Sequence, residues 1–153
     1  MDTGNPGFRF RGENELKSRA RILVVDDEEL LRRMLRQILL REGYGAVVGV
    51  SDGETALARL RQERFDIMIT DVRMPLMSGL ELLVQVKQEF PKISVIVMTG
   101  FGDIHTPDEA KNLGADEYVT KPFKAREIEV IVERVRMRQI VSGRAVHRTA
   151  AAS

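Results

Sequence analysis

Residues 21–29 read Arg-Ile-Leu-Val-Val-Asp-Asp-Glu-Glu, a run of four apolar residues that leads directly into four acidic ones. A short, continuous apolar run is typical of a β-strand buried on both faces. Apolar residues then recur at helical spacing, with arginines on the opposite side, up to Gly43. This stretch therefore predicts a strand followed by a helix, with a cluster of carboxylates at the turn between them.

The same alternation continues along the chain. Further apolar runs predict strands at residues 46–50, 65–70, 93–98 and 117–120. A helical pattern follows each of these runs. Three of the helices begin with capping boxes: Ser51-x-x-Glu54, Ser78-x-x-Glu81 and Thr106-Pro107-x-Glu109. Strict alternation with unbroken apolar strands implies a parallel sheet between two layers of helices. The sequence thus predicts one α/β domain with a doubly wound, five-stranded parallel sheet, a (βα)5 three-layer sandwich.

The chain has 153 residues, enough for one such domain and short additions. Residues 1–20 show no hydrophobic period and predict a flexible leader, residues 21–140 the domain, and residues 141–153 a disordered tail. The absence of cysteine excludes disulfides, thiolate zinc sites and cysteine nucleophiles. Since no apolar run approaches membrane-spanning length and no signal-peptide core is present, we expect a cytoplasmic address without membrane contact.

The net charge of +1 conceals an uneven distribution. Residues 124–153 hold seven basic and three acidic residues, whereas residues 21–123 hold 13 basic and 17 acidic ones. We call residues 124–153 the basic arm; its arginines include Arg134, Arg136, Arg138, Arg144 and Arg148. We interpret this arm as a solvated helix end and tail. We expect no direct nucleic-acid binding, because no aromatic residues are interleaved in the arm. His105 and His147 lack ligand spacing and are predicted to be surface residues.

Polar residues follow the predicted strands where parallel sheets bind their ligands, outside the carboxyl ends. Asp26 and Asp27 follow the first strand, and Asp71 the third; Thr99 ends the fourth, and Lys121 follows the fifth. An oxygen-only carboxylate cluster suits Mg²⁺. Aspartate is a competent nucleophile towards phosphorus, and an ammonium with a hydroxyl can neutralise phosphoryl oxygens. The residues therefore point to Mg²⁺-dependent phosphoryl chemistry on an aspartate.

Four motifs in order resemble the receiver domain of two-component response regulators. They are Leu23-Val24-Val25-Asp26-Asp27, Asp71-Val72-Arg73-Met74-Pro75, Met98-Thr99-Gly100 and Thr120-Lys121-Pro122-Phe123, and the resemblance covers residues 21–138. It implies a flavodoxin-like fold and a signalling domain rather than an enzyme, one that catalyses only its own phosphorylation and dephosphorylation. The Lys121-Pro122 bond is a candidate cis peptide.

The resemblance also implies a role for each site residue. Asp71 would accept a phosphoryl group from a sensor histidine kinase or a histidine phosphotransfer protein. Asp26, Asp27 and Asp71, with the backbone carbonyl of Arg73, would hold Mg²⁺. Thr99 and Lys121 would bind phosphoryl oxygens, and Thr99 with Tyr118 would form the switch. The fourth helix, fifth strand and fifth helix would then contact a downstream output protein or domain, and a homodimer through this face is a further hypothesis.

Two other readings stay open. A flavin electron carrier has the same fold, but acidic Asp26-Asp27 would repel the phosphate that its first loop must hold. A receiver-like docking module that works without phosphorylation is the stronger rival. The sequence also leaves open whether the chain is a stand-alone receiver or part of a larger regulator.

In the fourth helix only Pro107, Ala110 and Leu113 suit an inward face, which predicts that this helix is weakly anchored to the sheet.

Overall fold

The computed structural model describes residues 11–100 and 107–143. Its five strands form one parallel sheet in the order β2-β1-β3-β4-β5. The strands are β1 (Arg21–Val25), β2 (Ala46–Val50), β3 (Ile67–Asp71), β4 (Ser94–Thr99) and β5 (Glu117–Thr120). The helices are α2 (Arg11–Arg19), α3 (Glu29–Arg41), α4 (Gly53–Gln62), α5 (Gly79–Glu89), α6 (Pro107–Asn112) and α7 (Ala125–Val141).

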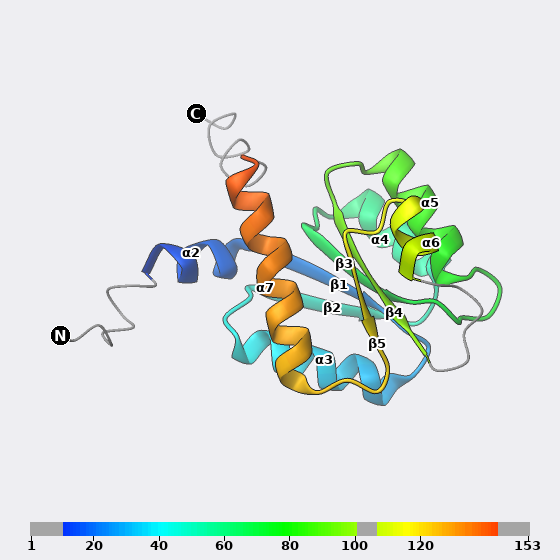
Figure 1. The fold of residues 1–153 in the computed structure, drawn as a ribbon, viewed down its shortest axis with the longest axis horizontal. Helices are drawn as coiled ribbons and strands as arrows, with labels where there is room; N and C mark the ends of the chain where they lie inside the picture. Colours follow the sequence, from blue (N-terminus) through cyan, green and yellow to red (C-terminus); the bar gives the residue numbers. More distant parts are fainter. Residues whose placement is uncertain (1–10, 101–106, 144–153) are drawn as a thin grey trace.

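The helices cover both faces of the sheet. In Figure 1, α3 and α7 lie on one side, and α4, α5 and α6 lie on the other. Each face buries its own apolar cluster: Leu23 and Met68 belong to one, and Ile22 and Ile69 to the other. Because successive strand residues point to opposite faces, a strand buried on both sides must be apolar throughout. The predicted doubly wound, three-layer architecture is confirmed.

Helix boundaries follow local hydrogen bonding. The predicted capping box of α5 is present, with Ser78 and Glu81 bonded reciprocally. The predicted cap of α4 is wrong by one residue, because the Asp52 carboxylate, rather than Ser51, accepts from the amide of Thr55 at 2.8 Å. A carboxylate is the better acceptor at the positive end of a helix. Thr106, and with it the cap predicted for α6, lies outside the described residues.

Two strands end later than the apolar pattern predicts. The predictions for β3 and β4 stop at Thr70 and Met98, whereas the structure extends them to Asp71 and Thr99. Asp71 is therefore in register with Met98, and Thr99 with Thr120. Both candidate site residues are thus the last residues of hydrogen-bonded strands, which restricts their backbones more than a loop would.

The prediction of a flexible leader is wrong for residues 11–19, which form α2. This helix has little apolar periodicity, so its sequence gives no helical signal. It is held by tertiary contacts: the side chain of Arg136 donates to the Leu16 carbonyl at 2.8 Å, and the amide of Gly45 donates to the Lys17 carbonyl at 3.1 Å. Residues 1–10 lie outside the described part.

The interpretation of the basic arm as solvated is wrong for Arg136. This residue is buried on α7, where it also donates to Gln139 at 2.9 Å. Arg134 and Arg138 are about half exposed and pair with Glu117 of β5. Arg136 differs from them because it lies on the inward face of α7, where side-chain and backbone oxygens compensate its burial. Arg144, Arg148, His105 and His147 lie outside the described residues, as does most of the predicted tail.

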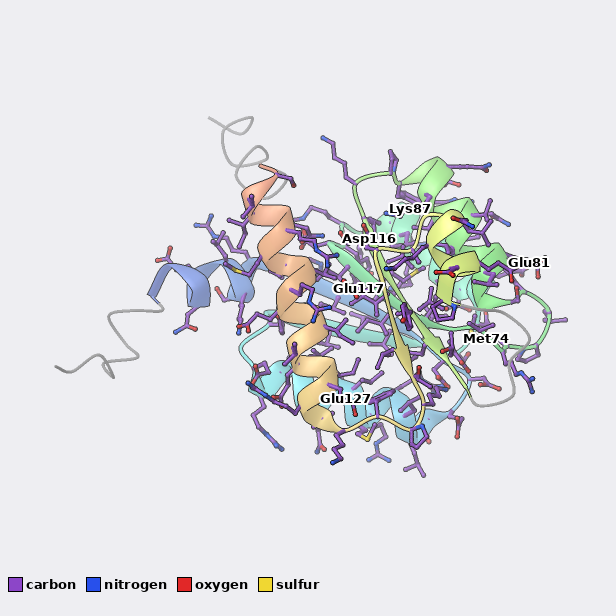
Figure 2. The ribbon with its side chains drawn as sticks, viewed as in Figure 1. Met74, Glu81, Lys87, Asp116, Glu117 and Glu127 are labelled. Atoms are coloured by element: carbon purple, nitrogen blue, oxygen red, sulfur yellow. The ribbon has the colours of Figure 1, made fainter. Side chains whose placement is uncertain are left out.

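The short α6 matches the expected weak anchoring. Of its six residues only Ala110 is buried, and Leu113, just after it, is partly exposed. A firmer contact lies beside it: Asp116 accepts hydrogen bonds from Lys87 and from the amide of Val95, both at 2.8 Å. Figure 2 shows Lys87 and Asp116 together where α5 approaches the start of β5. The start of β5 is therefore tied to α5, while α6 has few apolar contacts of its own.

Candidate functional site

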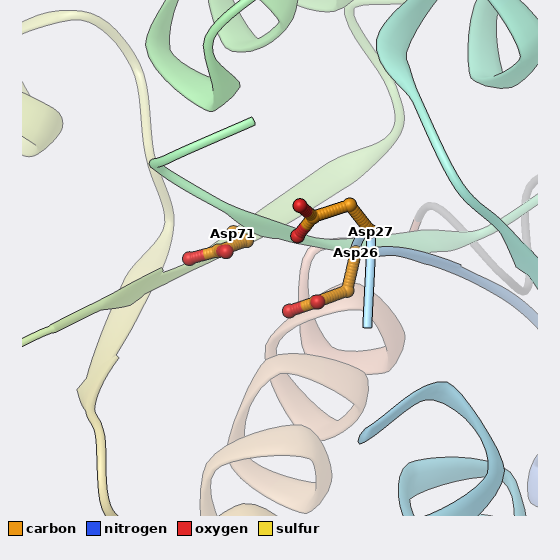
Figure 3. A group of neighbouring side chains, drawn as sticks. All are labelled: Asp26, Asp27 and Asp71. Carbon is orange, nitrogen blue, oxygen red and sulfur yellow. The ribbon is translucent and has the colours of Figure 1, made fainter. Parts of the chain in front are cut away.

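Three carboxylates meet at the carboxyl edge of the sheet. Asp26 and Asp27 follow β1, Asp71 ends β3, and one oxygen from each lies within 4.8 Å of the others (Figure 3). Asp26 and Asp71 are buried, whereas Asp27 is exposed. The cluster therefore has two fixed inner carboxylates and one that faces solvent. It is the metal-ligand set that the sequence predicts, apart from the Arg73 carbonyl.

Backbone contacts hold Asp26 in place. Its amide donates to the Val50 carbonyl at 3.1 Å, and its carboxylate accepts from the amide of Glu28 at 2.8 Å. The guanidinium of Arg32 donates to the Asp26 carbonyl, also at 2.8 Å. Asp26 is thus anchored to β2 and to the first turn of α3, which fixes the direction of its carboxylate.

Lys121 joins the ends of three strands. Its Nζ lies 3.1 Å from Asp26 Oδ2, 3.3 Å from Asp71 Oδ2 and 3.9 Å from Glu28 Oε1. Its amide donates to the Thr99 carbonyl at 2.7 Å. The ammonium therefore lies between the two buried carboxylates. The Lys121-Pro122 peptide bond is cis, as the sequence suggested.

The remaining predicted residues lie on the neighbouring strands or just after them. Thr99 is buried at the end of β4, and Tyr118 is half-buried on β5, with Lys111 Nζ 5.9 Å from the centre of its ring. The side chain of Arg73 is exposed, while its amide donates to the Asp71 carboxylate. The structure thus brings Asp26, Asp27, Asp71 and Lys121 together and places Thr99 at the same edge. The ligand role of the Arg73 carbonyl and the switch role of Tyr118 stay predictions.

At both Asp71 and Lys121, burial and the nearest opposite charge shift the pKa in opposing directions. Burial, followed by the charge of Asp26, raises the pKa of Asp71 above its ordinary value of 3.8, although Lys121 acts in the other direction. Burial alone would lower the pKa of Lys121, but its hydrogen bond to Asp26 and the charges of Asp71 and Asp26 raise it. Lys121 is therefore a cation at neutral pH, and ionised Asp71 costs folding free energy.

Replacing Asp71 by asparagine should therefore stabilise the fold at neutral pH. The folded-state pKa of Asp71 lies above its unfolded value, so the carboxylate form weakens folding once the pH exceeds that unfolded value. We expect Asp71→Asn to raise the thermal midpoint by a few degrees at pH 7. The gain should shrink as the pH falls through the raised folded-state pKa and vanish below about 3.8, because the carboxyl is then protonated in both states. Thermal unfolding of both proteins across pH 3–8 checks this, and a lower midpoint for the variant at pH 7 would contradict it.

Sequence reasoning missed Gly79, which shapes the turn after Asp71. A Cβ on Gly79 would lie 1.8 Å from the Asp71 carbonyl oxygen, and the Gly79 amide donates to the Val72 carbonyl at 2.9 Å. Glycine is required here because the first turn of α5 passes directly against the phosphoacceptor candidate's backbone. Its place next to the Ser78 cap was visible in the sequence, but the close approach was not.

Leu76 is a second feature that the sequence does not reveal. It has a φ of 71°, it is 96% exposed, and the amide of Met77 donates to the Pro75 carbonyl at 2.8 Å across it. This three-residue turn is strained for a residue with a Cβ. An exposed leucine in such a turn gains nothing from burial, so the backbone strain at Leu76 lowers the stability of the loop after Asp71.

Leu76→Gly should relieve part of that cost. Glycine adopts positive φ freely but loses more entropy on folding, so we expect a net gain of about 0.5 kcal/mol. Leu76→Ala retains the Cβ and should give no such gain. Urea unfolding of the three proteins distinguishes these cases, and equal stability of the glycine and alanine variants would show that the turn is unstrained.

Comparison with known proteins assigns this arrangement to a family. The model of the response regulator receiver domain matches residues 22–133. The chain belongs to the response regulator receiver family. It is 35% identical to the alkaline phosphatase synthesis transcriptional regulatory protein PhoP of Bacillus subtilis, covering 80% of this chain and 50% of PhoP. It is 36% identical to the probable transcriptional regulator ycf27 of Guillardia theta, covering 79% of this chain and 47% of that protein.

Solved receiver structures have the same fold. A response regulator receiver domain protein from Clostridium thermocellum has a TM-score of 0.74 and 31% identity, over 80% of this chain and 98% of that one. The chemotaxis protein CheY4 of Vibrio cholerae has a TM-score of 0.70 and 32% identity, over 76% of this chain and 98% of CheY4. The chain spans about half the length of PhoP and ycf27. The flavodoxin-like receiver fold and membership of two-component signalling are confirmed. No helix within the described ranges is long and apolar enough to cross a membrane.

Proposed function

We propose that Asp71 accepts a phosphoryl group from a phosphohistidine on a partner protein, and that the acyl phosphate switches the receiver. The observation that carries this proposal is Lys121 Nζ, 3.3 Å from Asp71 and 3.1 Å from Asp26 at the carboxyl edge of the sheet. A partly buried ammonium there provides charge for phosphoryl oxygens as they arrive. A receiver-like docking module would not need this buried polar centre.

In the proposed step, a carboxylate oxygen of Asp71 forms a bond to phosphorus as the P–N bond of the phosphohistidine breaks. The bonding electron pair leaves with the ring nitrogen of the histidine. Burial raises the pKa of Asp71, which makes its carboxylate more basic than an ordinary one. Lys121 and the Thr99 hydroxyl would then bind oxygens of the transferred group.

The donor set fits a divalent cation. Asp26, Asp27 and Asp71 offer hard oxygen ligands within 4.8 Å of one another, and exposed Asp27 leaves one side open to water, as magnesium sites in proteins usually are. The carbonyl of Arg73 would complete the protein's share. When bound, Mg²⁺ would supply positive charge next to the phosphoryl oxygens.

A protein donor suits the surface beside Lys121. A cleft of about 620 Å³ is lined by side chains of α3 and of the segment after β5, including Leu31, Met34, Pro122 and Phe123. Leu30, which also lines it, is 78% exposed. Exposed apolar patches at an active edge are typical of protein contacts. This supports a sensor histidine kinase or a histidine phosphotransfer protein as the donor, rather than a small phosphate compound alone.

The switch would use the weakly anchored end of the fold. Thr99 would move towards the phosphoryl group, and half-buried Tyr118 and α6 would follow, because α6 has little apolar contact to hold it. Complete switching from 1:99 to 99:1 requires about 5.5 kcal/mol of differential interaction. The face of α6, β5 and α7 would then bind an output protein, an output domain or a second copy of the chain.

The test is phosphorylation by acetyl phosphate with Mg²⁺, measured by intact mass. Wild type should gain one phosphoryl group, whereas Asp71→Asn should gain none. If wild type gains none, binding of beryllofluoride distinguishes rapid hydrolysis from a site that does not bind a phosphoryl group. Failure of both measurements would leave the docking module as the better reading.

Light scattering with and without beryllofluoride tests the homodimer, and a monomer in both states would exclude it.

A further inference from the structure

The helix before the sheet is held in an unusual way. α2 has the sequence Arg-Gly-Glu-Asn-Glu-Leu-Lys-Ser-Arg, in which Leu16 is the one large apolar residue. A nine-residue helix of this composition is marginal by itself in water. Leu16 is itself only half-buried, so apolar burial accounts for little of the docking. Polar contacts to α7 and to the start of β2 must supply the rest.

Arg136 makes the central contact. Its Nη2 donates to the Leu16 carbonyl at 2.8 Å, in the last turn of α2, where helix carbonyls lack partners within the helix. Its Nη1 donates to Gln139 Oε1, and Gln139 in turn donates to the Asp66 carbonyl and to Ser94 Oγ at 2.8 and 2.9 Å. Arg136 is 2% exposed, and these hydrogen bonds connect α2 through α7 to the beginnings of β3 and β4.

Lys17 makes the second contact. Its Nζ lies 3.2 Å from Glu133 of α7, 4.0 Å from Glu42 after α3, and 5.6 Å from the centre of the Tyr44 ring. Within the part of the chain that the structure describes, the buried hydroxyl of Tyr44 has no hydrogen-bond partner. Burial, and then the charges of Glu133 and Glu42, raise its pKa, so it remains a neutral group. An unsatisfied buried hydroxyl opposes docking, because undocking would return it to water.

Gly45 allows the close approach. Its amide donates to the Lys17 carbonyl at 3.1 Å, and a Cβ there would lie 1.8 Å from the Ser18 carbonyl oxygen. α2 is therefore docked by a buried guanidinium, a partly exposed ion pair and backbone contacts. Such contacts can be exchanged for contacts with water at less cost than an apolar face.

We propose that α2 is a releasable polar latch on the C-terminal half of α7, which opens while the receiver stays folded. Release would uncover Arg136 and Tyr44 and free the last turns of α7 from α2. Since α7 belongs to the face that the proposed function assigns to output, the signalling consequence of the latch rests on that function. The latch itself does not, because its contacts lie at the opposite end of the sheet from Asp71.

Hydrogen exchange on the full chain tests the latch without a phosphodonor. In wild type, the amides of α2 should exchange more slowly than those of an unfolded peptide but faster than those of β1 and β3. Gly45→Ala displaces the Ser18 carbonyl, and Arg136→Met removes the donor to Leu16. Either variant should speed exchange in α2 and in residues 136–141 by about tenfold and leave β1 and β3 protected.

Two matched variants complete the design. Gly12→Ala makes the same substitution within α2, where a Cβ meets nothing within 4 Å, and should slow exchange there, because alanine favours helix. Arg138→Met removes a half-exposed arginine of α7 that pairs with Glu117, and should leave α2 unchanged. Added salt should speed exchange in α2, since Glu133 is half exposed.

Three results would overturn the proposal. Exchange of α2 only together with β1 and β3 would make it an integral part of the core, and no protection at all in wild type would mean that it does not dock. Unchanged exchange in both Gly45→Ala and Arg136→Met would show that the named contacts do not hold it. Phosphorylation of the same samples by acetyl phosphate reports separately on Asp71, so failure of the latch and failure of the switch are distinguishable.

Discussion

Gly79→Ala should destabilise the domain by about 3 kcal/mol or more and impair any reaction at Asp71. The new Cβ would be placed 1.8 Å from the Asp71 carbonyl oxygen and 3.0 Å from the Cα of Val72. These are backbone atoms at the end of a central strand, so they cannot rotate away as a side chain can. Either α5 must move from the sheet or the end of β3 must shift, and the second change displaces the candidate phosphoacceptor. Urea unfolding and phosphorylation by acetyl phosphate measure the two effects.

Gly53→Ala is the matched control. Gly53 begins α4 as Gly79 begins α5, but the Cβ at Gly53 would meet the sulfur of Met77 at 2.6 Å. Since the methionine side chain can adopt another rotamer, we expect a loss of no more than about 1 kcal/mol. Equal losses in the two variants would show that the contact with the Asp71 backbone is not what requires glycine at residue 79.

Lys121→Met should cost about 2–4 kcal/mol of stability at pH 7 and abolish detectable phosphorylation of Asp71. The substitution leaves the buried carboxylates of Asp26 and Asp71 without the ammonium that lies 3.1 and 3.3 Å from them. Two carboxylates whose oxygens lie within 4.8 Å of each other in a buried site repel strongly. The lysine's own pKa is raised on folding, so in wild type its contribution is fully present at neutral pH and is lost only above pH 10.5.

The pH and metal dependence of this variant identify the cause. The deficit should shrink as the pH falls towards 4, because the pKa of Asp71 is raised and its protonated carboxyl no longer needs a counter-charge. Added Mg²⁺ should restore more stability to the variant than to wild type if the acidic cluster holds the cation. Lys92→Met, at an exposed lysine far from the cluster, should change stability by less than about 0.5 kcal/mol. A deficit that is independent of pH would point to lost packing rather than to unpaired carboxylates.

The strands and the acidic edge could be predicted because each leaves a local signal. Ile22 to Val25 are apolar without interruption because they lie in a strand covered on both faces. Parallel strands bring their carboxyl ends to one edge, so Asp26, Asp71 and Lys121 were expected to meet although they are far apart in sequence. The exact strand ends were not predictable. The apolar pattern stops one residue before Asp71 and before Thr99, but the backbones of these polar residues still pair with the neighbouring strands.

The α/β class, the order of the elements and the residues of the acidic edge are all predictable from the residues alone, because burial and strand direction impose periodic and positional patterns on single residues. The folded chain was needed to reveal the docking of α2, the burial of Arg136, and the need for glycine at residues 45 and 79. Each of these depends on a close approach between backbone or charged groups from segments distant in the chain. Such an approach has no periodicity, so it leaves no pattern along the sequence.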